Sequence, residues 1–196
     1  MTEILIVCHS VHGNTLAMAR EVARGVESVD RASARLRSVA PVTSAIDPVA
    51  REPAADGPAL VDVRDLEECD GLILGSPTRF GNMAAAVKFF LDGTASEWVS
   101  GTLVGKPAGV FTSTGSLHGG QESTLLSMML PLLHHGMVIV GLPYSEPALT
   151  QTRSGGTPYG PSHVASKDSD RPVDADEATL CRALGRRVAE IAGRLA

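Results

Sequence analysis

Cysteine is scarce in this sequence, and its spacing excludes two common kinds of stabilised fold. The three cysteines, Cys8, Cys69 and Cys181, lie far apart, and no C-x-x-C pair is present. Such spacing indicates neither a disulfide framework nor a zinc ribbon. We therefore expect reduced, mostly buried thiols in a cytoplasmic protein.

A net positive charge and long apolar runs are also missing from the sequence. The net charge of −5 gives no basic footprint for nucleic acid. No apolar run approaches the ~18 residues of a membrane span. The first residues lack the basic and apolar segments of a secretory signal. We expect no nucleic-acid partner and no membrane span.

Several catalytic motifs are absent as well. The chain has no G-x-S-x-G elbow and no H-E-x-x-H motif. His134 and His135 are adjacent, so they cannot share one helix face as metal ligands would. We expect no metal site.

The most informative segment lies near the N-terminus, where a short apolar run at residues 4–8 meets an amphipathic helical pattern. The loop between them consists of Ser10, Val11, His12, Gly13, Asn14 and Thr15. The first turn of a helix has unpaired N–H groups and a partial positive charge. This loop therefore predicts a phosphate site, although the same hydroxyls also occur as simple helix caps.

The loop does not match the two best-known nucleotide motifs. It lacks the lysine of G-x-x-x-x-G-K-[ST], and no G-x-G-x-x-G follows the first strand. A hydroxyl-rich loop without lysine is typical of the flavodoxin-like arrangement, which binds flavin mononucleotide (FMN).

Strand and helix patterns alternate along the chain and predict a parallel α/β sheet covered on both faces. The predicted strands are residues 4–8, 34–39, 71–75, 107–112 and 137–142. Helices are predicted from residue 14, at 83–91, at 121–135 with a break or kink at Pro131, and after Asp174, with one further turn within 62–70. Residues 41–58 and 143–172 are predicted loops. We expect one flavodoxin-like domain over residues 1–196, a three-layer sandwich whose five strands have the order 2-1-3-4-5.

Three loops should meet where the strands end, at 10–15, 76–82 and 113–120. The second offers hydroxyl, amide and apolar groups to a flavin ring. It contains Pro77, Thr78, Arg79, Phe80, Gly81 and Asn82. The third loop would let its main chain come close to the flavin ring. It contains Ser113, Thr114, Gly115, Ser116 and Gly119. Each segment is also compatible with an ordinary strand-to-helix turn, but three in register predict a ligand site.

Several motifs resemble those of WrbA-type NAD(P)H:quinone oxidoreductases. They are residues 76–83 (SPTRFGNM), 113–115 (STG), 119–122 (GGQE), 134–140 (HHGMVIV) and 155–160 (GGTPYG). The resemblance covers nearly the whole chain. It departs at His12, where the family usually has a tyrosine that meets the nicotinamide, and at residues 116–118, which add about one residue. Residues 41–58 also match poorly.

The resemblance implies an NAD(P)H dehydrogenase (quinone), a homotetramer that uses FMN and either NADH or NADPH to reduce quinones by two electrons. It places the phosphate on residues 10–15 and the ring on Thr78, Arg79, Phe80 and residues 113–119. Trp98 and His134 would line the pocket above the flavin. We expect His12, Phe80 and Trp98 to contact substrate, His134 to hydrogen-bond a quinone oxygen, and turnover to be ping-pong. The alternatives are an interaction module associated with the tryptophan repressor and a one-electron flavodoxin.

Overall fold

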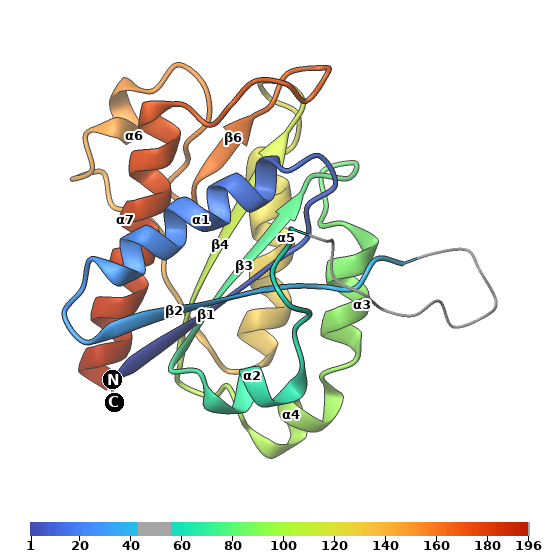
Figure 1. The fold of residues 1–196 in the computed structure, drawn as a ribbon, viewed down its shortest axis with the longest axis vertical. Helices are drawn as coiled ribbons and strands as arrows, with labels where there is room; N and C mark the ends of the chain where they lie inside the picture. The colour runs from blue at the N-terminus through green and yellow to red at the C-terminus, as the bar shows by residue number, and fades with distance from the viewer. Residues whose placement is uncertain (43–55, 196) are drawn as a thin grey trace.

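The computed structural model describes residues 1–42 and 56–195, in which strands and helices alternate (Figure 1). The strands are β1 (Thr2–Cys8), β2 (Ala32–Ser38), β3 (Gly71–Pro77), β4 (Pro107–Thr114), β5 (Val138–Ile139) and β6 (Ser162–Val164). The helices are α1 (Asn14–Glu27), α2 (Val63–Glu68), α3 (Ala85–Asp92), α4 (Ala95–Ser100), α5 (Gln121–His134), α6 (Ala148–Gln151) and α7 (Ala175–Leu195). The predicted loop at 41–58 falls mostly outside the described residues.

Within the described residues, all the strands pair in parallel in one sheet. The path runs β2-β1-β3-β4-β5, and β6 also pairs with β4. The predicted number of five strands is therefore wrong, because the described sheet has six. A parallel α/β sheet is confirmed.

The sixth strand arises because the edge beside β4 is interrupted. β5 pairs with Pro107 and Ala108 at the start of β4, whereas β6 pairs with residues 112–114 at its end. The predicted strand at 137–142 is thus shortened to two residues. The chain leaves the edge after Val140, whose N–H donates to the Ala108 carbonyl at 2.7 Å. It returns at Pro161, whose carbonyl accepts from the Thr112 N–H at 3.1 Å.

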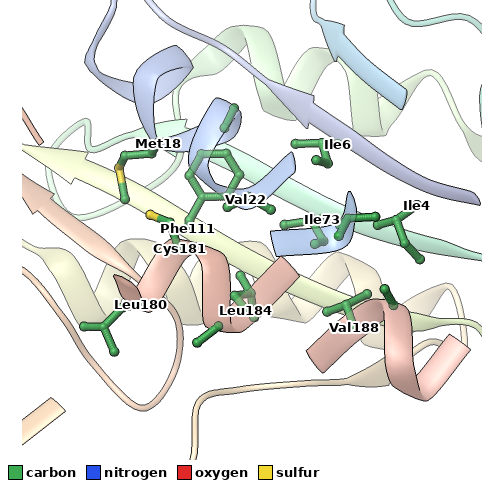
Figure 2. Packing of buried hydrophobic residues seen from close by; sticks show 14 of the residues in the cluster. Ile4, Ile6, Met18, Val22, Ile73, Phe111, Leu180, Cys181, Leu184 and Val188 are labelled. Atoms are coloured by element: carbon green, nitrogen blue, oxygen red, sulfur yellow. The ribbon is translucent and has the colours of Figure 1, made fainter. Parts of the chain in front are cut away.

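Two apolar clusters, one on each face of the sheet, hold the layers together. Helices α1 and α7 cover one face, and Figure 2 shows Phe111 of β4 between Met18 and Val22 of α1 and Cys181 of α7. The other face packs against α3 and α5 through residues such as Leu74, Val87 and Leu125. Strands buried on both faces explain the nearly continuous apolar runs.

Three local features differ from the sequence expectation. Trp98 lies in α4, where no helix was predicted, and the predicted 143–172 loop contains α6 and β6. Helix α5 continues through Pro131 to His134, and its last turn is closed by the His135 N–H, which donates to the Pro131 carbonyl at 3.0 Å. The predicted helical turn within 62–70 is confirmed as α2, whose cap Asp62 accepts from the Arg64 N–H at 2.8 Å.

Candidate functional site

The loop between β1 and α1 has the geometry expected of an anion site. Gly13 precedes the helix with a φ of 87°, in the left-handed region that favours glycine. A Cβ atom at Gly13 would find no heavy atom within 4 Å, so the space above the loop is open. The Leu16 N–H donates to the Ser10 Oγ at 3.2 Å, which leaves the Ser10 hydroxyl proton free to donate. The N–H groups of Asn14 and Thr15 have no partner within the helix.

The three predicted loops come together around one pocket. Its lining contains eleven of the predicted cofactor residues, namely Ser10, Val11, His12, Asn14, Thr15, Pro77, Thr78, Arg79, Ser113, Thr114 and Gly115. The remaining walls are Ala165 and Ser169. The pocket lies at the carboxyl ends of β1, β3 and β4, where ligands of parallel α/β sheets bind.

Ala165 and Ser169 were missed by the sequence analysis, because they lie in a segment without periodicity. The structure brings this segment to the site through β6. The Ala165 N–H donates to the Thr114 carbonyl at 2.7 Å, and the Asn14 Nδ2 donates to the Ser169 carbonyl at 3.0 Å. Only the register of β6 on β4 places these residues beside the phosphate loop, so no local motif could reveal them.

The charges around the pocket favour an anion. The first turn of α1 carries no acidic residue. Burial, and then the nearby positive charge of Arg79, lower the pKa of His9, which favours its neutral form. Among the residues that line the pocket, Arg79 supplies a permanent positive charge. A negative group placed here meets one guanidinium and the partial positive charge of the helix N-terminus.

The size of the pocket limits what it encloses. Its volume of about 70 Å³ is far below the roughly 300–1,000 Å³ of sites that enclose a whole drug-sized ligand. The donor set and this volume fit the phosphate of FMN. The flavin ring would have to lie outside this pocket, toward the more exposed parts of the second and third loops.

The other residues of the second loop lie at that outer rim. Phe80 is fully exposed and has a φ of 53°, and Gly81 follows with a φ of 75°. The backbones of Arg79 and Asn82 exchange two hydrogen bonds of 2.8 and 3.0 Å, which close this turn. The Thr78 hydroxyl pairs with the Thr124 hydroxyl at 2.8 Å. The Thr78 N–H also has a partner, since it donates to the Ser113 carbonyl at 2.9 Å.

The third loop is held against the second loop by contacts of its own. A Cβ atom at Gly120, whose φ is 99°, would come within 2.8 Å of the Gly81 Cα, so the two loops touch at their glycines. The Ser116 carbonyl accepts from the Thr114 hydroxyl at 2.9 Å and from the Gln121 Nε2 at 3.0 Å. Ser116 and Gly119 themselves lie beyond the pocket lining.

Trp98 and His134 do not lie at this pocket within one chain. They lie side by side, since the Trp98 Nε1 donates to the His134 carbonyl at 2.8 Å, and both line a separate hollow with Leu130 and Pro131. That hollow is at the C-terminal end of α5, whereas Gln121 at the other end is near the rim of the pocket. Because α5 has 14 residues, it is about 20 Å long, and its two ends are far apart. Figure 1 shows α4 at the opposite end of the molecule from β6.

No group of three or more His, Cys, Asp or Glu side chains in the described ranges could hold a metal ion. Burial raises the pKa of the Cys8 thiol to about 12 and that of Cys69 to about 11, despite nearby cations. These thiols are therefore poor ligands and nucleophiles at neutral pH. No helix in the described part of the chain is long and apolar enough to cross a membrane.

Comparison with known proteins agrees with this geometry. Residues 2–146 match the family model described as NADPH-dependent FMN reductase. The chain belongs to this FMN reductase family. The match covers β1 to β5 and with them the three predicted loops of the pocket. The predicted resemblance is confirmed.

Two relatives align over nearly the whole chain. A protein of Chromohalobacter salexigens named NAD(P)H dehydrogenase (quinone) is 43% identical, with 100% of both chains covered. A protein of Syntrophobacter fumaroxidans with the same name is 46% identical over 98% of each chain.

The solved structures agree on the fold. A WrbA-like flavodoxin structure from Agrobacterium tumefaciens has a TM-score of 0.70 at 25% identity, with 100% of both chains covered. An archaeal flavodoxin has a TM-score of 0.65 at 19% identity, with 98% of this chain and 99% of that chain covered. The flavodoxin-like fold is confirmed.

Proposed function

We propose that this member of the FMN reductase family is an NAD(P)H dehydrogenase (quinone) that uses FMN to reduce quinones by two electrons. The observation that carries the proposal is the convergence of three strand-end loops on one small anion pocket at the N-terminus of α1. Relatives that align along the whole chain carry the same enzyme name. Their names favour the enzyme over the interaction module and the one-electron flavodoxin.

The phosphate of FMN would be held by the N–H groups of Asn14 and Thr15, the Ser10 hydroxyl and Arg79. FMN, when bound, accepts two electrons from NADH or NADPH and delivers them to a quinone. The second and third loops would contact the ring through Thr78, Arg79, Phe80 and residues 113–119. His12 is exposed at the mouth of the pocket, where a nicotinamide would meet it.

We propose that Trp98 and His134 reach the site from a neighbouring copy of the chain. The phosphate pocket is too small to enclose a flavin, and Phe80 stands fully exposed beside it. Trp98 and His134 form an exposed pair at the far end of the same chain. A second copy could place this pair opposite Phe80. Phe80 and Trp98 would then hold planar substrates, and the His134 imidazole would hydrogen-bond a quinone oxygen.

A homotetramer is the assembly that we propose. Leu126, Leu130 and Leu133 form an exposed stripe on α5, and Trp98 and Leu130 share one hollow. Monomers rarely expose a contiguous apolar surface larger than a few hundred Å². The stripe continues into the residues that we expect at a neighbouring active site, so assembly and substrate binding would use adjoining surfaces.

Turnover is proposed to be ping-pong. Nicotinamide and quinone are both planar, and each must come within ~3–3.5 Å of the flavin to react. One pocket would therefore hold them in turn. Parallel double-reciprocal lines with NADH and a benzoquinone are expected, and intersecting lines would contradict the shared pocket. His134→Ala should slow oxidation of the reduced enzyme by quinone more than its reduction by NADH.

Two further proposals concern the chain as a whole. Residues 1–196 are proposed to act as one domain, because α7 packs against α1 and against the sheet. The protein is proposed to be cytoplasmic, since Cys8, Cys69 and Cys181 are all buried free thiols.

A further inference from the structure

The segment that forms the fourth wall of the phosphate pocket, residues 165–171, has a conformation that needs external support. Ser166 and Ser169 have φ values of 71° and 58°, in the left-handed region that side chains other than glycine rarely adopt. The segment is closed on itself by the Arg171 N–H, which donates to the Ala165 carbonyl at 3.1 Å. Such backbone persists only where its surroundings hold it.

The support comes from Glu177, a carboxylate with no exposed surface in the first turn of α7. Its Oε1 accepts from the Gly155 N–H at 3.0 Å, the Val164 N–H at 3.1 Å and the Arg171 Nη1 at 3.1 Å. Its Oε2 accepts from the His163 Nδ1 at 2.7 Å and the Asp174 N–H at 3.0 Å. Both oxygens are therefore fully used.

A helix cap explains only part of this arrangement. The Glu177 N–H donates to the Asp174 Oδ1 at 2.9 Å, and with the reverse bond the two residues form a capping box. A capping box needs one of the five bonds that Glu177 accepts. The other four come from residues 155–171, which lie outside the helix, so the carboxylate also binds the segment that leads to the pocket.

His163 adds a further link between Glu177 and this segment. It is fully buried in β6, its Nδ1 faces the Glu177 carboxylate, and its Nε2 lies 3.1 Å from the Arg171 carbonyl. Both ring nitrogens therefore face oxygen atoms, one on Glu177 and one on residue 171. The Arg171 guanidinium in turn pairs with the carboxylates of Glu177 and Asp174.

We propose that Glu177 is a positioning residue for the FMN phosphate, acting through His163 and Arg171 on residues 165–171. The Arg171 Nη1 donates to the Val164 carbonyl at 2.6 Å, directly before Ala165 of the pocket wall. Ser169 is in turn fixed to Asn14 of the phosphate loop. Glu177 itself does not line the pocket, so it acts by keeping the wall closed. The inference rests on the phosphate site proposed above.

The test compares FMN with riboflavin, which has the same ring and ribityl chain but no phosphate. Each would be titrated into full-length apoprotein, with binding followed by quenching of flavin fluorescence. If the wall is closed in only a tenth of Glu177→Gln molecules, the Kd for FMN rises about tenfold. The Kd for riboflavin should stay within about twofold. The matched control is Glu190→Gln, an exposed glutamate on the same helix, which should change neither constant.

An equal rise in the Kd for FMN and the Kd for riboflavin would mean that Glu177 only supports the fold, which contradicts the proposal. A Glu177→Gln variant in which neither Kd changes would contradict it as well. Far-UV circular dichroism would establish that each variant is folded. If Glu177→Gln does not fold, the same criteria apply to Arg171→Gln, whose side chain is about one-third exposed (32%).

The variant Ser10→Ala distinguishes a failure of the phosphate site from a failure of the role proposed for Glu177. This variant should weaken the binding of FMN more than that of riboflavin. If it weakens the binding of neither, the phosphate binds elsewhere and Glu177 has no role in holding it. If Ser10→Ala weakens FMN binding but Glu177→Gln does not, the phosphate site is supported and the role proposed for Glu177 is contradicted.

Discussion

Single hydroxyl groups in the phosphate loop should contribute measurably to cofactor affinity. Ser10→Ala and Thr15→Ala each remove a hydroxyl beside the N-terminus of α1, and hydrogen bonds to charged groups contribute about 1.5–3 kcal/mol. Each variant should therefore bind FMN about tenfold or more weakly in a fluorescence titration. Thr150→Ala, an exposed threonine in α6, is the control and should bind as the wild type does. Wild-type affinity in both loop variants would place the phosphate elsewhere.

His12 should limit the recognition of the nicotinamide. It lies exposed at the mouth of the pocket, where the resembling family usually has a tyrosine. A larger aromatic ring adds stacking of about 0.5–1.5 kcal/mol. His12→Tyr should therefore lower the KM for NADH by a few-fold in steady-state assays. An unchanged KM would show that His12 has no such role.

At the residue scale, the sequence revealed the parts of the site that depend on local pattern. Residues 10–15, 77–79 and 113–115 lie at or just after the carboxyl ends of buried strands, so their place at the rim could be predicted. Ala165 and Ser169 could not, because a long-range pairing of β6 brings them there. Trp98 and His134 were expected at the pocket from the family resemblance, which does not reveal that His134 lies at the far end of α5, a helix about 20 Å long.

At the element scale, α7 should depend on the ionised Glu177 for its attachment. Burial alone would raise its pKa, but hydrogen bonds from His163, Asp174 and Val164 lower it from 4.5 to about 2. Between these values the unfolded chain binds a proton that the folded chain does not. The stabilisation, on the order of 3 kcal/mol, is therefore present above pH 4.5 and is lost as the pH falls toward 2.

Urea unfolding at several pH values between 5 and 2 would test this. The free energy of unfolding of the wild type should fall with a steeper slope than that of Glu177→Gln, whose side chain does not titrate. Glu190→Gln should keep the wild-type slope. An equal slope in Glu177→Gln and the wild type would contradict the role of this carboxylate in acid stability.

The prediction of elements succeeded where apolar periodicity is strong. Strands β1, β3 and β4 are buried on both faces and appear as continuous apolar runs, so they were found. Helix α4 and strand β6 have only six and three residues, too few for a period to show. The split of the edge strand into β5 and β6 depends on where residues 140–161 leave and rejoin β4, which no local signal records.

At the scale of the whole molecule, self-association should depend on the leucine stripe of α5. Leu130→Asp places a charge at the centre of this exposed stripe, where burial of an unpaired charge is unfavourable. Light scattering should give about four times the 20.4 kDa chain mass for the wild type and a smaller species for the variant. The control Leu195→Asp changes another exposed leucine and should leave the mass unchanged. A monomeric wild type at micromolar concentration would reject the homotetramer.

The central claim is that the pocket holds FMN for electron transfer from NAD(P)H to quinones. The most direct measurement is the visible spectrum of the FMN-loaded protein in anaerobic stopped flow, first with NADH and then with a benzoquinone. We predict that NADH bleaches the flavin absorption and that one equivalent of quinone restores it. Ser10→Ala, loaded at the same FMN concentration, should give a smaller bound-flavin signal. A protein that binds no FMN, or a flavin that neither NADH nor NADPH bleaches, would contradict the account.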